Sequence, residues 1–445
     1  MNISIPDGWL ASLGERTATG LANEIAGLIT SGVIAPDDRL PTIRQVATAV
    51  GISVGTVAEA WTRLRERQLI ETRRRGGTRV LPVPRSSRFS GWADVDLLLS
   101  SPDPTLQPPL EEAVLRGLRQ PGVNAWGREQ MVDALRLAVQ PLWPFAAEAW
   151  TSAGGGTEGL WLATRAAIQS GRPVAVEEPA PPGFLAVLAE MDVEVIGIPV
   201  DDEGPLPGAL ARARDEGIGA VVIQPGGPFS DRAVLSAARA VELATVLDGS
   251  DIAVVEDDSL GPLSSTPVRS LGGFRPEHTI RVLSYCKAYG LDLRTSVLGG
   301  ARRLIDRAVL ARSGGLASNS RILQNALAVM LQDPTATAMV DTARDRYAGR
   351  RAAALSAFAA AGLTARSGPG SLVVWVDVPS ERVAAVALAT RGVVVEGASS
   401  SFVSVRDHDQ LRVSIAQLPD DPSRTAELAD TFVRSIQGDL RVRFD

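Results

Sequence analysis

The sequence predicts two different folds in one chain: an N-terminal winged helix-turn-helix of the α+β class, and a larger α/β domain followed by a smaller α+β subdomain. Helical periodicity and then an arginine-rich hairpin over 1–81 predict the first fold. Short apolar runs that alternate with helical stretches from about residue 110 predict a mostly parallel sheet. We therefore expect domains over 1–81, 110–344 and 345–445, joined by a proline- and serine-rich linker over 82–109.

Three helices and a hairpin are expected at the start of the chain. Apolar residues at helical spacing predict a helix over about 17–31, and a turn separates it from a short helix over about 42–49. Ser53 is a suitable N-cap for a third helix, and residues 71–80 have strand character on both sides of a glycine turn. This order is typical of a winged helix-turn-helix, whose second motif helix enters the major groove of DNA.

The candidate DNA contacts lie at the start of the third helix and in the hairpin. The exposed positions Ser53, Gly55 and Thr56 would face base edges or phosphates. Arginines would meet the phosphate backbone and supply affinity rather than sequence choice. The arginines predicted to contact phosphates are Arg44, Arg73, Arg74, Arg75 and Arg79, and Gly76 of the hairpin turn is predicted to contact DNA with them. A helical protein-interaction module with a solvated arginine loop is the alternative.

The same region resembles the GntR-type DNA-binding domain. The resemblance rests on residues 40–44 and 51–57, on Ala60-Trp61 and on the Arg-Gly-Gly-Thr wing. Val54 departs from it, because the family often has arginine at this position. The resemblance covers nearly the whole domain and implies a protein that binds double-stranded DNA.

Charge and composition narrow the classes of protein to consider. Residues 1–85 hold 11 arginines against 8 acids, whereas the remainder holds 34 basic against 43 acidic residues, as expected if one end meets nucleic acid. One cysteine excludes an internal disulfide, and two histidines argue against a zinc site. We find neither a signal peptide nor an apolar run long enough to cross a bilayer, and we expect a cytoplasmic protein with no membrane partner.

Lys287 is the only lysine in the chain, and the other 44 of the 45 basic residues are arginine. Arginine keeps its proton, whereas a desolvated lysine can lose one and attack a carbonyl carbon. Ser284 precedes this lysine and Arg294 follows it, and both residue types can hold a phosphate. A lysine flanked by phosphate ligands suggests a Schiff base with pyridoxal 5'-phosphate (PLP). A stray surface lysine in an arginine-biased chain is the alternative.

Two further stretches suit a phosphorylated pyridine. A glycine-rich turn over 151–160 runs into a helix, where backbone N–H groups and the Thr157 hydroxyl would hold a phosphate, although such turns often only bend the chain. A buried strand ends in three acids with Asp257 in the middle. A carboxylate there would point into the crevice beyond the sheet and keep a pyridine nitrogen protonated. An exposed acidic loop is the alternative.

Gln224 and Arg412 complete the candidate site. Gln224 follows the apolar strand 220–223 and could hydrogen-bond a ring hydroxyl. Arg412 lies inside the apolar strand 411–416, where an arginine pairs either with a carboxylate of the protein or with one of a ligand. We expect the ligand's carboxylate.

The order of these motifs resembles the fold-type I PLP-dependent aminotransferases. With the GntR-type head in front, the whole chain resembles the MocR-type regulators, in which a winged helix is fused to an aminotransferase-like effector domain. The resemblance implies an internal aldimine at Lys287, a contact of Asp257 with the pyridine nitrogen, and Gln224 near the ring hydroxyl. It implies Arg412 as the ligand of an effector carboxylate, and a homodimer. The phosphate ligands that it implies are Gly156, Thr157, Ser284 and Arg294.

Three departures from the family pattern concern the ring of the cofactor. Ser259 stands where a tyrosine usually touches the ring oxygen, and Pro181 stands where an aromatic residue usually stacks on the ring. The segment 124–127 is shorter than the region that gives a phosphate contact across the dimer. Loss of a stacking ring weakens cofactor binding by about 1 kcal/mol.

The sequence therefore favours a PLP-dependent transcriptional regulator that senses a small amine or amino acid by aldimine exchange at Lys287. Two alternatives stay open. One is a true aminotransferase with an accessory DNA-binding domain. The other is a regulator that no longer binds PLP and senses its ligand without covalent chemistry, for which Ser259 and Pro181 are the reasons.

Overall fold

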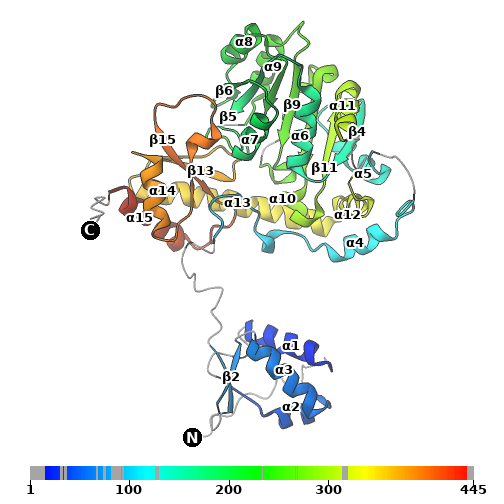
Figure 1. The fold of residues 1–445 in the computed structure, drawn as a ribbon, viewed down its shortest axis with the longest axis vertical. Coiled ribbons are helices and arrows are strands. Elements are labelled where there is room, and N and C mark those ends of the chain that lie inside the picture. Colours follow the sequence, from blue (N-terminus) through cyan, green and yellow to red (C-terminus); the bar gives the residue numbers. More distant parts are fainter. Residues whose placement is uncertain are drawn as a thin grey trace. The chain divides into compact units, whose positions relative to one another are not determined.

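The protein folds as two compact units, Met1–Asp94 and Val95–Asp445, each with its own core (Figure 1). Residues 95–109 of the expected linker thus belong to the larger unit. The computed structural model describes residues 16–30, 34, 38–66, 69–73, 77–81, 92, 95–125, 130–232, 234–265, 267, 269–312 and 319–437.

The smaller unit is the predicted winged helix-turn-helix. Its helices are α1 (Ala18–Thr30), α2 (Ile43–Val50) and α3 (Val54–Glu66). Its strands β1 (Arg39–Leu40), β2 (Ile70–Arg73) and β3 (Gly77–Val80) form an antiparallel sheet in the order β1-β3-β2. A capping box between Thr42 and Gln45 begins α2, and Gly51 ends it with a φ of 74°. Trp61 and Leu64 of α3 are buried in the core.

An eight-stranded sheet organises the larger unit, in the order β4-β11-β10-β9-β8-β5-β6-β7. Strands β10, β9, β8, β5 and β6 are parallel, and β4, β11 and β7 meet their neighbours antiparallel. The predicted α/β domain with a mostly parallel sheet is confirmed. The strands are β4 (Ala149–Ala153), β5 (Val174–Glu178), β6 (Val195–Asp201), β7 (Gly204–Pro205), β8 (Ala220–Ile223), β9 (Ala253–Asp258), β10 (Thr279–Ser284) and β11 (Ser296–Gly300).

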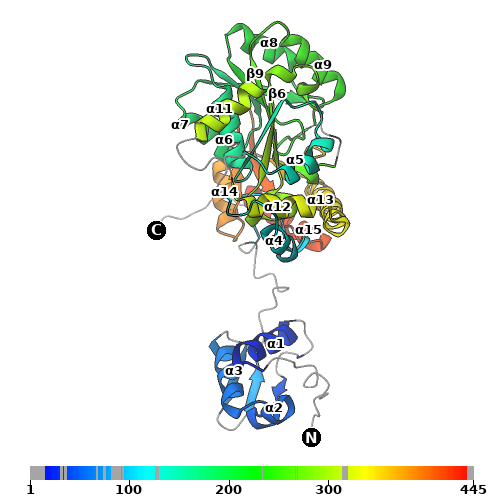
Figure 2. The same cartoon turned by 90° about the vertical axis from the view of Figure 1, so that its right-hand side faces the viewer.

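Helices cover both faces of this sheet, because its central strands are apolar on both faces. One core lies between the sheet and α6 (Gly156–Ala167), α7 (Pro182–Glu190) and α11 (Arg302–Arg312). A second core lies between the opposite face and α8 (Pro207–Asp215) and α9 (Ala237–Val246). Figure 2 shows α6, α7 and α11 on one side of the strands and α9 on the other.

A second sheet, the expected smaller α+β subdomain, follows the long helix α13 (Pro334–Ala360). It is antiparallel, in the order β12-β13-β15-β14. The strands are β12 (Ala365–Arg366), β13 (Val373–Val378), β14 (Glu396–Gly397) and β15 (Asp409–Ser414), with helices α14 (Glu381–Ala389) and α15 (Pro422–Gln437). The remaining helices of the larger unit are α4 (Glu111–Leu118), α5 (Asp133–Val139), α10 (Cys286–Tyr289) and α12 (Arg321–Leu331).

None of the helices in the described part of the chain combines the length and the apolar character that a bilayer-spanning segment needs.

Candidate functional site

A cavity of about 330 Å³ lies in the larger unit, where β9 and β10 end. Parallel pairing sets Asp257 of β9 beside Val282 of β10, and the chain then turns through Ser284 into α10, which carries Lys287. The expected residues that line this cavity are Gly156, Thr157, Asp257, Ser284, Lys287 and Arg294. Residues separated by more than a hundred positions in the sequence therefore meet in one pocket.

The Lys287 side chain is partly buried and reaches this cavity. Burial lowers the pKa of the Lys287 amine; the negative charge of Asp257 opposes this shift, and the positive charge of Arg412 adds to it. The amine lies 5.9 Å from the centroid of the Phe229 ring. Within the described residues, Nζ has no hydrogen-bond or ion-pair partner, so it is free to act as a nucleophile.

Asp257 is the one acid of the β9 terminus without a protein partner in the described part of the chain. Its neighbours Glu256 and Asp258 both form ion pairs with the buried Arg281. Burial and the negative charge of Asp258 raise the pKa of Asp257 to about 7, against the opposing charges of Lys287 and Arg281. A buried carboxyl group without a partner is costly, and the ring nitrogen of a pyridine would supply one.

The N-terminus of α6 and the residues around Arg294 form a cradle for an anion. A Cβ at Gly156 would lie 3.1 Å from the Cβ and Oγ atoms of Ser284, so a side chain there would crowd Ser284. Gly155 has a φ of 111°, in the region that favours glycine. The Arg294 guanidinium is exposed and has no partner among the residues described. Helix N–H groups, a hydroxyl and a free guanidinium together fit a phosphate.

Gln224 lies outside the lining of this cavity. Its backbone N–H donates to Glu177 at 2.7 Å, and its side-chain amide donates to the Pro179 carbonyl at 3.0 Å. Phe229, which follows Gln224 by five positions, lines the cavity. A contact of Gln224 with a cofactor thus needs a side-chain rearrangement and stays a prediction.

Arg412 is buried on β15 and forms an ion pair with Glu396 of β14. Its guanidinium carbon lies 5.6 Å from the Phe229 ring centroid, and its buried Nε has no hydrogen-bond partner among the described residues. The structure thus pairs this arginine with a carboxylate of the protein, where we had expected a ligand's carboxylate. Its role toward an effector stays a prediction.

The departures from the family pattern lie in the pocket itself. Pro181 and Ser259 both line the cavity. The Ser259 hydroxyl is buried and lacks a hydrogen-bond partner in the described part of the chain. Of the segment 124–127, residues 126 and 127 lie outside the described residues, so the expected contact across a dimer is not described either.

The segment 95–107 falls in the expected linker and instead passes beside the pocket. Asp96 accepts hydrogen bonds from the backbone of Leu99 and Ser101, and Leu99 lines the cavity. Gln107 donates from Nε2 to the carbonyls of Cys286 and Lys287, both at 3.3 Å. The segment thus touches the turn that presents the lysine.

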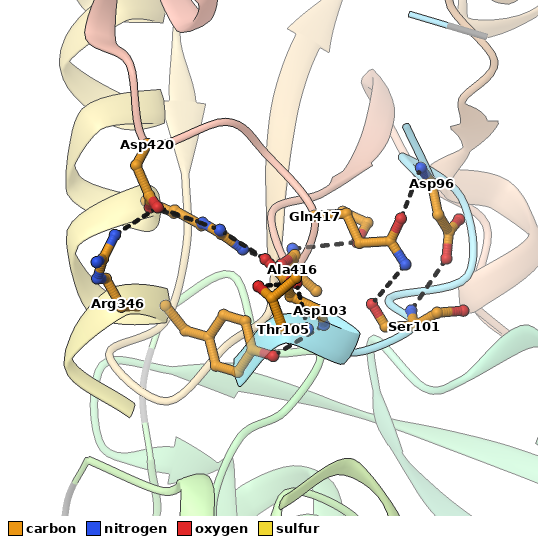
Figure 3. A network of polar contacts seen from close by, with 11 residues as sticks. Asp96, Ser101, Asp103, Thr105, Arg346, Ala416, Gln417 and Asp420 are labelled. Atoms are coloured by element: carbon orange, nitrogen blue, oxygen red, sulfur yellow. Dashed lines mark hydrogen bonds and ion pairs between the residues drawn. The ribbon is translucent and has the colours of Figure 1, made fainter. Parts of the chain in front are cut away.

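Polar contacts also fasten the segment 95–107 to the smaller subdomain (Figure 3). Gln417 bonds to the backbone of Asp96 and Ser101. The buried Arg350 of α13 pairs with Asp103 at 2.8 Å and with Asp420 at 2.9 Å. The sequence of the segment 95–107 did not predict this network. Its partners lie more than 200 positions away, and contacts at that distance leave no local pattern.

The expected DNA contacts lie at the start of α3 and on its neighbours in the smaller unit. Ser53 and Gly55 are exposed, and Thr56 is half-buried; the Ser53 hydroxyl caps the helix by accepting from Thr56 N–H at 3.0 Å. Arg44 on α2 and Arg79 on β3 are exposed. The side chain of Arg73 and all of Arg74, Arg75 and Gly76 lie outside the described residues.

Comparisons with known proteins agree with both units. The family "Bacterial regulatory proteins, gntR family" matches residues 17–80, and "Aminotransferase class I and II" matches residues 101–427. The vitamin B6 salvage pathway transcriptional repressor PtsJ of Salmonella typhimurium is 26% identical over 92% of this chain and 96% of its own length. The transcriptional regulator TauR of Rhodobacter capsulatus is 24% identical over 92% of this chain and 94% of its own.

Solved structures agree on the fold of the larger unit. Aspartate aminotransferase from Thermus thermophilus with maleate superposes with a TM-score of 0.67 at 23% identity, over 77% of this chain and 92% of its own. The α-aminoadipate aminotransferase LysN from the same organism gives a TM-score of 0.68 at 20% identity, over 77% of this chain and 92% of its own. The chain therefore belongs to the aminotransferase class I and II family and, with its gntR-family head, is a transcriptional regulator of the MocR type.

Proposed function

We propose that this regulator uses PLP held at Lys287 to sense a small amine or amino acid, and that the occupied pocket changes how the protein binds its DNA operator. One observation carries the proposal. The only lysine of the chain reaches a cavity where a buried carboxyl group and an exposed guanidinium also lack protein partners among the described residues.

The pocket holds residues suited to the aldehyde, the ring nitrogen and the phosphate of PLP. Bound PLP supplies an aldehyde carbon that amines attack reversibly and a protonated ring that withdraws electrons. Lys287 would attach to that carbon, and Asp257 would hold the proton of the ring nitrogen. Gly156, Thr157, Ser284 and Arg294 would bind the phosphate. The names of two relatives support a ligand related to this cofactor, since PtsJ is a repressor of vitamin B6 salvage and PdxR of Corynebacterium glutamicum is a regulator of pyridoxine biosynthesis.

Sensing would occur when the effector's amine takes the place of the Lys287 amine on the cofactor. The two protons that the effector's amine loses in this exchange would pass to the freed Lys287 amine, and the turn that carries Lys287 would shift against Gln107 of the segment 95–107. This segment directly follows the DNA-binding unit in the sequence. A coupling of about 1–3 kcal/mol between effector and operator would be enough for control.

Sensing without turnover is favoured over a working aminotransferase. Pro181 lines the pocket where an aromatic ring would stack on the cofactor, Ser259 offers a short hydroxyl, and Gln224 lies away from the cavity. Fewer contacts to the ring leave its position less fixed than catalysis requires. We expect a cytoplasmic homodimer, as the resemblance to MocR-type regulators implies.

The absorption spectrum of the full-length protein with PLP tests this function. We expect a visible band that changes when ethylamine is added and that is absent in Lys287→Ala. Cys286→Ser is the matched control, because Cys286 also lines the pocket and its loss removes no amine. An identical band in Lys287→Ala, insensitive to ethylamine, would contradict the proposal.

A further inference from the structure

Arg412 is a buried cation whose charge this chain already balances. It lies within β15 with 4% of its surface exposed, and its Nη2 pairs with the carboxylate of Glu396. The strand register sets Glu396 directly opposite Arg412, so the ion pair follows from the backbone pairing of β14 with β15. A buried guanidinium requires such a partner, because an unpaired charge is costly to bury.

A second carboxylate, that of Glu381, lies close to the backbone next to Glu396. A Cβ at the next residue, Gly397, would lie 2.8 Å from the carboxyl carbon of Glu381, so the Glu381 carboxylate lies against this part of the backbone. Glu381 in turn accepts a hydrogen bond from the Ser399 N–H at 3.1 Å. The Glu396 side chain is about one third exposed, so it can rotate away from Arg412 toward solvent.

This ion pair lies close to the pocket, next to Phe229. Phe229 lines the cavity, and its ring centroid is 5.9 Å from Lys287 Nζ and 5.6 Å from the Arg412 guanidinium carbon. Arg412 and Glu396 do not line the cavity. A carboxylate on an amine bound at Lys287 that reached Arg412 would lie next to the negative charge of Glu396, which repels it.

We propose that Glu396 is the specificity residue of the pocket and serves as a built-in substitute for a ligand's carboxylate. The preferred effectors are then amines without a carboxylate beside the amine, and α-amino acids bind more weakly because their carboxylate meets the negative charge of Glu396. This inference rests on the proposed function, because it assumes that effector amines bind at Lys287. It narrows the effector from amines and amino acids in general to amines that lack the α-carboxylate.

The test compares ethylamine with L-alanine, which differ by one carboxylate. Each is titrated into the full-length protein with PLP, and its dissociation constant is taken from the absorption change and checked by calorimetry. In wild type we expect ethylamine to be preferred. In Glu396→Gln, Arg412 loses its competing carboxylate, and the preference should shift toward L-alanine by about 10- to 100-fold, the worth of one charge-assisted hydrogen bond.

Matched variants separate this effect from a general loss of charge. Glu381→Gln removes a neighbouring carboxylate that does not pair with Arg412, and it should leave the preference for ethylamine over L-alanine unchanged. In Glu396→Gln/Arg412→Gln the gain for L-alanine should disappear, as a double-mutant cycle requires. If Glu396→Gln does not fold, Glu396→Asp keeps the charge but loosens the pair and should give part of the shift.

Failure of the inference and failure of the proposed function give different results. An unchanged preference in folded Glu396→Gln, with the visible band and its response to ethylamine intact, would overturn the role of Glu396 alone. Absence of a visible band in wild type would overturn the proposed function, and the inference with it.

Discussion

Glu177 is a buried acid that the proposed chemistry does not use, although the charge of Asp257 acts on it. It lies near the end of β5 and accepts the backbone N–H of Gln224 at 2.7 Å. Burial raises the pKa of Glu177 to about 8; the hydrogen bond from Gln224 opposes this, and the negative charge of Asp257 adds to it. Glu177 is therefore protonated near neutral pH.

The raised pKa of Glu177 predicts how stability depends on pH. The folded protein holds this proton over a range where the unfolded chain has lost it, so the stabilisation is complete below pH 4.5 and is lost as pH rises to about 8. Glu177→Gln keeps a hydrogen-bond acceptor and cannot ionise. We expect it to exceed wild type in free energy of unfolding by roughly 2–4 kcal/mol at pH 8.5 and to match it near pH 4.5.

Urea denaturation at the two pH values measures this difference. Glu216→Gln is the control, since Glu216 is exposed at the end of α8 and should show no such dependence. If the free energy of unfolding of Glu177→Gln differed from that of wild type by the same amount at both pH values, Glu177 would ionise normally and the prediction would be wrong.

The sequence alone predicted some residues of the site and missed others. Lys287 and Asp257 could be assigned, because a solitary amine among arginines and an acid at the end of an apolar strand are both typical of a ligand site. Glu396 and Phe229 could not. Glu396 follows three valines and looks like a surface residue, and its role depends on the register between β14 and β15, which no local pattern specifies.

Among the elements, the sheet was predictable and the segment 95–107 was not. The parallel strands are short apolar runs, and such runs indicate burial on both faces. The segment 95–107 has a loop's composition, yet it is ordered by contacts to α13 and to the chain after β15. Contacts between residues so distant in sequence leave no periodic signal.

The network around Arg350 predicts how firmly this segment is held. Asp103 pairs with Arg350 at 2.8 Å and caps the turn at Thr105. Asp103→Ala removes both contacts but leaves Asp420 as a partner for the arginine. We expect a loss of about 1–3 kcal/mol in the free energy of unfolding of the larger unit.

Urea denaturation measures this loss, and Asp133→Ala is the control. This substitution breaks an exposed pair with Arg136, and it should change the free energy of unfolding by no more than about 0.5 kcal/mol. Equal losses in both variants would contradict a structural role for the network.

At the scale of the whole molecule, a DNA-binding unit is joined to a unit with a cofactor-binding fold. DNA binding requires that arginines of the small unit meet phosphates. Arg44→Ala should weaken binding to any duplex DNA and lower the slope of log affinity against log salt by about 1, because one phosphate contact is lost. Fluorescence anisotropy over a salt series measures the slope. Arg165→Ala, an exposed arginine of the larger unit, is the control, and an unchanged slope in Arg44→Ala would remove Arg44 from the interface.

The attachment of PLP to Lys287 is the claim on which sensing depends, and chemical trapping tests it most directly. The full-length protein is incubated with PLP and treated with borohydride, which makes the attachment permanent, and its peptides are analysed by mass spectrometry. Since the chain has one lysine, we predict a single modified peptide, the one that contains Lys287, and no such adduct in Lys287→Ala. An unmodified Lys287 peptide, or an adduct that persists in Lys287→Ala, would contradict this attachment.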